Sequence, residues 1–406
     1  LLDLSLRENP VGSRVGQTLE DKLEILPQLR EFGLRNIVLG SPVYMVPDER
    51  EIDHDFMMML HQTGADLSGC YAIATIGLVD GKGGFRPDPS MEHLVEYGVH
   101  HAILEIHASP SGMADTYDFY TLVNSLVESI TWLRGRMRSL DNAGPKIFID
   151  IVDGCDAFAE EPEQTLRLVE AFDGITVDGV MIEDRRGTYM PFQVGAYVAA
   201  VRNMVSPTMT ILVHAHAGSG FENAVLIEAL LRGANGVWGG LPRQEAASLG
   251  ELIANLARIG NPHVDRDYRL DRLLPLTASL QAFDDETTVA DDVPVIGRNA
   301  YRLASSALRQ RAGRFMDLPP ERLGGRYRYR VSPLVSDKEP VRGRLAEVTG
   351  RLPEEYGDPV VEMMLRLMRH DLRGGKRIDY DDPANLTQLY ERARRRMKQV
   401  YPRIVE

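Results

Sequence analysis

The chain has 406 residues, 44% of them hydrophobic, and a formal net charge of −13, from 46 Lys and Arg against 59 Asp and Glu. This length allows a sizeable core and more than one domain, and the acidic charge argues against a general nucleic-acid or membrane-surface binder. Two cysteines and the lack of a long apolar run predict no disulfide framework, no signal peptide, no membrane span and a cytoplasmic location.

Strand-like apolar runs alternate with amphipathic stretches over residues 1–260. Eight runs are typical of buried strands: Leu1–Leu6, Asn36–Leu39, Tyr71–Ile76, His101–Ile106, Lys146–Ile151, Gly179–Ile182, Thr210–Val213 and Gly236–Trp238. Helical patterns lie between them: Leu19–Phe32, Met91–Tyr97, Thr121–Leu140, Glu163–Phe172, Val194–Asn203 and Ala224–Leu231. This alternation predicts an α/β fold, a (β/α)8 TIM barrel. A doubly wound open sheet is the alternative, but no GxGxxG motif follows the first strand.

The pattern changes after about Asn261. Polar and proline-containing segments give way to four helical stretches, Ala300–Ala312, Lys338–Thr349, Asp358–Arg369 and Asn385–Val400. We therefore expect residues 261–406 to form a mainly helical C-terminal extension that docks on the barrel as a lid region, not a second catalytic domain.

Two histidines end the seventh strand-like run. His214 and His216 are spaced i, i+2, which places both imidazoles on one face of a strand, where they could bind one divalent cation. Arg7 and Glu8 follow the first strand, and the active site of a TIM barrel lies at the carboxyl ends of its strands. Glu8 would then complete an open three-ligand site, beside which Arg7 could neutralise an enolate or a carboxylate. Ordinary strand-end histidines and a rim ion pair are the alternatives.

Several motifs resemble those of the DRE-TIM metallolyases, the superfamily of isopropylmalate, homocitrate, citramalate and Re-type citrate synthases and of hydroxymethylglutaryl-CoA lyase. Asp3–Glu8 is similar to the strand-one motif Asp-x-x-Leu-Arg-Asp/Glu, and His214–His216 is similar to the strand-seven motif. Further similarities are Leu39–Pro42 after strand two, Asp184–Gly187 after strand six and Pro294–Tyr301 after the barrel. The resemblance implies that Glu8, His214 and His216 bind Mn, Mg or Zn and that Arg7 polarises the substrate carbonyl.

The chain also departs from the family pattern. Ala217 and Gly218 follow the histidines in place of Asn-Asp, and Arg185 replaces a threonine, offering a fork for a carboxylate or phosphate. The synthases' Glu-His dyad falls on Val152 and Leu308. The lyase's reactive cysteine is Leu241, and Gly250 falls near its metal-binding Asn.

Because the dyad is missing, the identity of the catalytic base is an open question. Glu105 and His107 stand at i, i+2 at the end of strand four, so they share a face of the barrel rim, and a carboxylate beside a histidine raises its pKa. We take both as candidate catalytic groups, with Ser109 and Arg185 as candidate substrate-binding residues. Purely structural roles for Glu105 and His107 are the alternative.

Three functions remain open. The first is a Claisen-type condensation of an acyl-CoA, such as acetyl-CoA, with a 2-oxo acid. The second is a metal-dependent carbon–carbon lyase or aldolase, which does not need the missing base. The third is a catalytically silent relative that binds a metabolite. A homodimer is the usual expectation for such enzymes.

Overall fold

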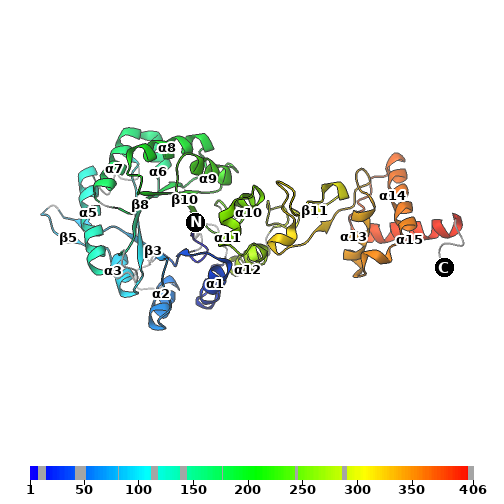
Figure 1. Ribbon diagram of the computed structural model, residues 1–406, viewed down its shortest axis with the longest axis horizontal. Helices are drawn as coiled ribbons and strands as arrows, with labels where there is room; N and C mark the ends of the chain where they lie inside the picture. Colours follow the sequence, from blue (N-terminus) through cyan, green and yellow to red (C-terminus); the bar gives the residue numbers. More distant parts are fainter. Residues whose placement is uncertain are drawn as a thin grey trace. The chain divides into compact units, whose positions relative to one another are not determined.

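The computed structural model describes residues 1–7, 15–41, 52–80, 82–110, 118–137, 144–175, 177–242, 246–285 and 290–400. Its first part is a TIM barrel, as predicted, and Figure 1 shows the ring of strands surrounded by helices. Predicted Glu8 lies outside the described residues.

Eight parallel strands close the barrel in the order β1-β10-β9-β8-β7-β6-β3-β2. The strands are β1 (Leu2–Asp3), β2 (Asn36–Val38), β3 (Cys70–Thr75), β6 (His101–Ile106), β7 (Ile147–Ile151), β8 (Gly179–Asp184), β9 (Thr210–Ala215) and β10 (Gly236–Gly239). The labels β4 (Leu78–Val79) and β5 (Phe85–Arg86) belong to a small antiparallel hairpin. Each of the eight predicted strands is therefore present. The first is shorter than expected because Asp3 accepts a hydrogen bond from the N–H of Ser5, which turns the chain.

Inward-pointing side chains fill the barrel with a packed apolar layer. Its buried residues come from alternate positions of all eight strands: Leu2, Leu4, Val38, Tyr71, Ile73, Ile103, Phe148, Met181, Leu212 and Trp238. The layer makes this barrel a solid core, so that substrate has access only at its ends.

The helices of the outer layer are α1 (Leu19–Phe32), α2 (Ile52–Gln62), α3 (Pro89–Glu96), α5 (Phe119–Arg136), α6 (Gly154–Glu160), α7 (Pro162–Gly174), α8 (Pro191–Met204) and α9 (Glu222–Leu231). Capping explains how α1 begins, because Thr18 and Asp21 form a capping box. It ends at Gly33, whose φ of 120° and close approach to the carbonyl of Asp267 leave no room for a side chain.

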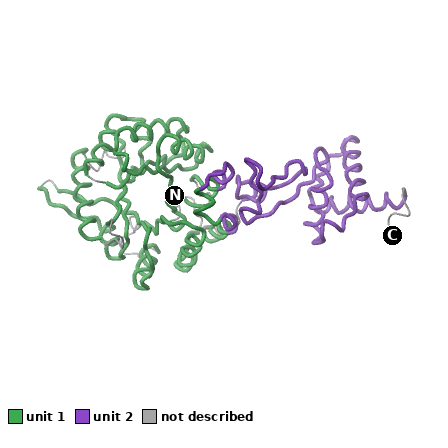
Figure 2. The backbone as a smooth tube through the Cα atoms, in the orientation of Figure 1, with its two compact units in different colours: residues 1–253, 263–269, 276–288 green, residues 254–262, 270–275, 289–406 purple. Residues whose placement is uncertain are grey.

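The chain divides into two compact units, which we describe separately (Figure 2). The barrel unit comprises residues 1–253, 263–269 and 276–288, and the C-terminal unit comprises 254–262, 270–275 and 289–406. The intervening helices are α10 (Leu249–Arg258), α11 (Pro262–Asp267), η2 (Leu270–Arg272) and α12 (Leu273–Asp285). Among the described residues, no helix has the length and apolar character needed to cross a membrane.

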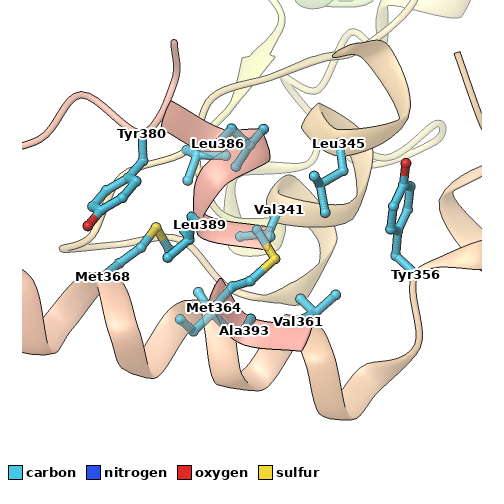
Figure 3. Packing of buried hydrophobic residues seen from close by; sticks show 12 residues of the cluster. Val341, Leu345, Tyr356, Val361, Met364, Met368, Tyr380, Leu386, Leu389 and Ala393 are labelled. Atoms are coloured by element: carbon cyan, nitrogen blue, oxygen red, sulfur yellow. The ribbon is translucent and has the colours of Figure 1, made fainter. Parts of the chain in front are cut away.

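Three helices dominate the C-terminal unit: α13 (Lys338–Thr349), α14 (Asp358–Arg373) and α15 (Pro383–Val400). Figure 3 shows their shared apolar core, in which Val341, Leu345, Met364 and Leu389 are almost completely buried. The predicted helix over Ala300–Ala312 is wrong. That segment contains strand β11 (Arg302–Leu303), which pairs with β12 (Arg328–Tyr329), and the short 3-10 turn η3 (Ser306–Leu308). Two further 3-10 turns are η4 (Pro320–Leu323) and η5 (Pro353–Glu355).

A buried carboxylate ties this helical core together. Asp371 on α14 accepts hydrogen bonds from the hydroxyl of Tyr380 at 2.6 Å, from Arg392 at 2.8 and 3.3 Å and from Lys376 at 3.2 Å. The bond from Arg392 has the largest part in holding the pKa of Asp371 well below its usual range. Its negative charge is therefore fully compensated, which is the condition for burying a carboxylate without large cost.

Candidate metal centre and its surroundings

The candidate site lies at the carboxyl ends of β6, β7, β8 and β9, four consecutive neighbours in the barrel. Polar side chains converge there, as the position of active sites in TIM barrels leads one to expect. Three of them, Glu183, His214 and His216, offer ligand atoms that all lie within 4.8 Å of one another.

The two histidines share one face, as their spacing predicts. Their ring centroids are 4.8 Å apart, with the ring planes nearly perpendicular. Strand β9 ends at Ala215, but the chain stays in register for one more residue because the N–H of His216 donates to the carbonyl of Asp184. This extension keeps the second imidazole beside the first.

His214 is prepared to act as a ligand through one nitrogen. Its Nδ1 lies 2.9 Å from the carbonyl oxygen of Trp238, which leaves Nε2 for another partner. Burial lowers the pKa of His214 to about 4, so the ring is neutral at pH 7, the form in which imidazole binds metal. A backbone carbonyl on the other ring nitrogen is the usual way in which proteins orient such a ligand.

Glu183 is the carboxylate that the sequence reasoning missed. Its Oε1 is 2.9 Å from Nε2 of His216, and its side chain is only 8% exposed. The signal in the sequence is the position of Glu183 near the end of the strand before β9, and in the structure its Cα pairs with that of His214. Side chains at paired positions of neighbouring strands point to the same face.

Two more acidic side chains lie near this cluster. Glu105 lies 3.6 Å from the guanidinium of Arg7, which brings together two candidates predicted from separate strands. Asp150 is fully buried, and neither of its carboxylate oxygens has a hydrogen-bond partner among the described residues. Burial, reinforced by the charges of Glu183 and Glu105, raises the pKa of Asp150 well above its usual value. A buried carboxylate without hydrogen-bond partners, close enough to feel the charge of Glu183, is the type of group that a cation would compensate.

His107 has a closer carboxylate than the predicted Glu105. Its Nδ1 lies 3.5 Å from Oδ2 of Asp153, and this interaction raises the pKa of His107, to which Glu105 adds a smaller effect. Asp153 also accepts the hydroxyl of Ser109 at 2.5 Å and the N–H groups of Ala108 and Ser109. Burial by itself raises the pKa of Asp153. The hydrogen bonds from His107, Ser109 and Ala108 outweigh this effect and lower the pKa to about 2. Ser109 is thus engaged in holding Asp153.

Arg185 stands in the turn after β8, exposed at the barrel mouth. Its charge acts on both Glu105 and His107. The predicted candidates Arg7, Glu105, His107 and Arg185 therefore occupy one neighbourhood with the two histidines.

Close packing of two loops explains Gly218. A Cβ atom at Gly218 would lie 2.6 Å from the carbonyl oxygens of Arg186 and Gly187, and one at Gly187 would lie 2.2 Å from that of His216. The N–H of Ser219 donates to the carbonyl of Gly187 at 2.8 Å. Glycine in place of the family's Asn-Asp aspartate thus lets the loops after β8 and β9 pack backbone to backbone.

The residues at the positions of the family dyad have no acid–base chemistry. Val152 follows β7, and Leu308 belongs to η3 of the C-terminal unit, where it is 63% exposed. Leu241 is fully buried after β10.

The donor set is suited to a divalent cation. One carboxylate and two imidazoles form the mixed N/O ligation that Mn, Fe and Zn accept, and one of these nitrogens is already oriented by a second partner. The fold and this cluster together define a TIM barrel with a candidate metal centre at the carboxyl ends of its strands.

Sequence and structure comparisons extend this description. No protein-family model matches the sequence. The chain is 23% identical over 343 residues to the (R)-citramalate synthase of Aquifex aeolicus, a match that covers 82% of this chain and 62% of that protein. It therefore spans less than two thirds of the length of this relative.

Two solved lyases share the fold. The HMG-CoA lyase of Acinetobacter baumannii, in complex with coenzyme A and 3-methylmalate, has a TM-score of 0.53 and 19% identity, with 70% of this chain and 91% of that chain covered. The hydroxymethylglutaryl-CoA lyase of Pseudomonas aeruginosa has a TM-score of 0.54 and 15% identity, with 71% and 94% covered. At these identities the solved neighbours show a shared TIM-barrel fold, and the sequence relative adds a likeness to a citramalate synthase.

Proposed function

We propose that the chain catalyses a metal-dependent Claisen-type condensation of an acyl-CoA, such as acetyl-CoA, with a 2-oxo acid. The observation that carries the proposal is the convergence of Glu183, His214 and His216 at the barrel mouth, with Arg7 close by. The likeness to a citramalate synthase supports condensation as the direction.

Glu183, His214 and His216 would hold the cation, and Glu8 is a further ligand by the family resemblance. When bound, a divalent cation polarises a carbonyl as a Lewis acid. Such a ligand set would leave positions for the oxo and carboxylate oxygens of a 2-oxo acid.

Arg7 supplies a fixed positive charge at the reacting oxygen. When the new carbon–carbon bond forms at the 2-oxo carbon, the electron pair of that carbonyl moves onto its oxygen. A guanidinium already in place at this oxygen stabilises the developing charge with little rearrangement. The ion pair with Glu105 at 3.6 Å keeps the guanidinium directed to the barrel mouth.

His107 is the proposed base. Asp153 faces Nδ1, which leaves Nε2 to take a proton from the acyl methyl group, and 45% of the His107 side chain is exposed. The methyl carbon then attacks the 2-oxo carbon, and hydrolysis of the thioester releases the thiol of coenzyme A. Asp153 serves as the positioning residue, since its carboxylate orients the ring and stabilises the protonated form.

A carbon–carbon lyase that uses the same groups in reverse is the second candidate. Val152 and Leu308 occupy the positions of the synthase dyad, and a lyase does not need that base. The fold neighbour solved with coenzyme A and 3-methylmalate is a lyase.

Metal content and turnover test the proposal. The purified full chain is dialysed against Mn2+, Mg2+ or Zn2+, and bound metal is counted in the wild type and in Glu183→Gln and His214→Ala. One ion per chain, lost in both variants, is expected. A wild type that binds none of the three would overturn both enzymatic proposals.

Thiol release then distinguishes the direction. Acetyl-CoA with a panel of 2-oxo acids should release free thiol, whereas 3-hydroxy-3-methylglutaryl-CoA should not be cleaved. Cleavage without thiol release would replace the condensation by the lyase reaction.

A further inference from the structure

A cavity of about 270 Å3 lies in the helical layer of the barrel unit, between α6 and the first half of α8. Four aromatic rings contribute to its lining, those of Phe158, Tyr189, Phe192 and Tyr197. The rings of Phe158 and Tyr197 are stacked, with centroids 4.4 Å apart and an interplanar angle of 14°. None of the lining residues belongs to the candidate metal centre. The cavity is therefore separate from the site described above.

Tyr197 brings an unsatisfied polar group to this apolar wall. Its side chain is 1% exposed, and its hydroxyl is buried without a hydrogen-bond partner among the described residues. The ring atom Cε1, next to the carbon that carries the hydroxyl, lies 3.6 Å from the point that a Cβ of Gly154 would occupy. This end of the ring thus lies at the start of α6, where Cys155 lines the cavity. A buried hydroxyl without a partner costs free energy, which a bound molecule could recover.

Water is a poor partner for this hydroxyl. A buried water is held by about two to four polar groups, and a cavity with an apolar lining tends to stay dry or to bind an apolar molecule. Cys155 adds little to the Tyr197 hydroxyl, because a thiol is only a weak donor. Burial raises the pKa of Cys155 well above its usual value, so the thiol is neutral.

The lining also indicates the charge of a ligand, since none of the lining residues is charged. Nearby, Asp156 accepts the hydroxyl of Tyr189 at 2.7 Å and Nε of Arg186 at 3.3 Å, so these three groups satisfy one another. Phe192, in contrast, leaves 68% of its apolar side chain exposed. A molecule in the cavity would meet aromatic surface and one free hydroxyl, and no uncompensated charge.

We propose that this cavity is a second ligand site, for a neutral molecule with one apolar ring that carries a hydroxyl group. The ring would pack against Phe158 and Phe192, and its hydroxyl would form a hydrogen bond with that of Tyr197, which can donate or accept. The volume fits, because an engineered cavity of about 150 Å3 in another protein holds benzene, and the larger cavity here has room for substituents. The site does not depend on the reaction proposed above.

Fluorine NMR titrations of the full chain test the assignment. The probes are 4-fluorophenol and fluorobenzene, which differ only in the hydroxyl group. Both should bind the wild type, and 4-fluorophenol should bind about three- to tenfold more tightly, as expected for one neutral hydrogen bond.

Two variants then locate the site. Tyr197→Phe should weaken the binding of 4-fluorophenol to the level of fluorobenzene and leave fluorobenzene unchanged, because it removes only the unpartnered hydroxyl. Ala159→Trp places a large side chain from an exposed lining position into the cavity and should weaken both probes at least about tenfold. Asn203→Trp is the matched control, since it adds the same side chain at an exposed position of α8 outside the lining. Circular dichroism verifies the fold of each variant.

Four outcomes would overturn the assignment. They are a folded wild type that binds neither probe at millimolar concentration, equal affinity of the wild type for the two probes, binding that Ala159→Trp leaves unchanged, and a preference for the phenol that survives in Tyr197→Phe. Coenzyme A provides a further test, because a separate site predicts that it leaves bound 4-fluorophenol in place. Displacement by coenzyme A would make the cavity part of an acyl-CoA site and would refute its assignment as a second one.

Discussion

Two buried carboxylates, Asp371 in the C-terminal unit and Asp150 in the barrel unit, have opposite surroundings. In the C-terminal unit Asp371 receives hydrogen bonds from Tyr380, Arg392 and Lys376. Among the described residues at the barrel mouth, Asp150 has no hydrogen-bond partner and Glu183 has only His216. A compensated charge stabilises a fold, whereas an uncompensated one persists where a substrate or cation completes it. The difference separates structural acids from functional ones, and five substitutions test it.

The largest effect is expected for His107→Ala. Removal of a general base lowers kcat by about 10²- to 10⁴-fold, while the fold should remain intact because the side chain is half exposed. Thiol-release kinetics measure the loss, and circular dichroism verifies the fold of the variant. If His107→Ala retains turnover near that of the wild type, another group is the base.

Asp371→Ala should lower the stability of the C-terminal unit by about 3 kcal/mol, because three donors lose a buried partner. Hydrogen exchange of the α14 and α15 amides in the full chain measures this change. The pKa of Asp371 is depressed by folding, so its contribution is complete above the unfolded pKa of about 4 and is lost as the pH falls through the folded pKa. Equal protection of wild type and variant at pH 7 would contradict the structural role.

Glu183→Gln tests an acid that we assign to function, as a metal ligand, and not to the stability of the fold. The amide keeps the shape of the side chain and removes the charge, so the affinity for Mn2+ should fall by about 10- to 100-fold with little loss of stability. Calorimetric titration gives the affinity, and thermal unfolding in EDTA gives the stability. A large loss of stability with unchanged Mn2+ affinity would move Glu183 into the structural class with Asp371.

Asp150→Asn should stabilise the metal-free barrel by about 1 kcal/mol at pH 8, since it removes a buried charge that has no hydrogen-bond partner among the described residues. Folding raises the pKa of Asp150, so the wild type loses stability relative to the variant as the pH rises from about 4 to the folded pKa. The pH dependence of stability thus has the opposite sign for Asp150 and for Asp371. Unfolding in EDTA at several pH values measures it, and a variant that is less stable than the wild type at pH 8 would reveal a hidden partner.

The smallest effect is a shift of the pH profile in Asp153→Asn. In the wild type, the Asp153 carboxylate raises the pKa of His107. The neutral amide of the variant should therefore lower the pKa of His107. The acidic limb of kcat/KM then moves to lower pH, while kcat falls because the ring is less well oriented. An acidic limb that stays in place would assign it to a group other than His107.

The sequence by itself determined the barrel and the helical C-terminal part. Local patterns were sufficient for these, because buried strands and amphipathic helices have fixed periods and because the spacing of His214 and His216 sets their common face. The segment Ala300–Ala312 failed as a predicted helix because its backbone pairs with β12, a partner distant in sequence.

Only the tertiary structure brought Glu183 to the histidines, gave His107 its partner Asp153 and paired Arg186 with Asp156. Each of these depends on which strands are neighbours and on how closely their loops approach. Gly218 illustrates the last point, because the reason for a glycine there is the backbone of Arg186 and Gly187 at 2.6 Å. Contacts between distant segments decide such pairs, and no local pattern encodes them.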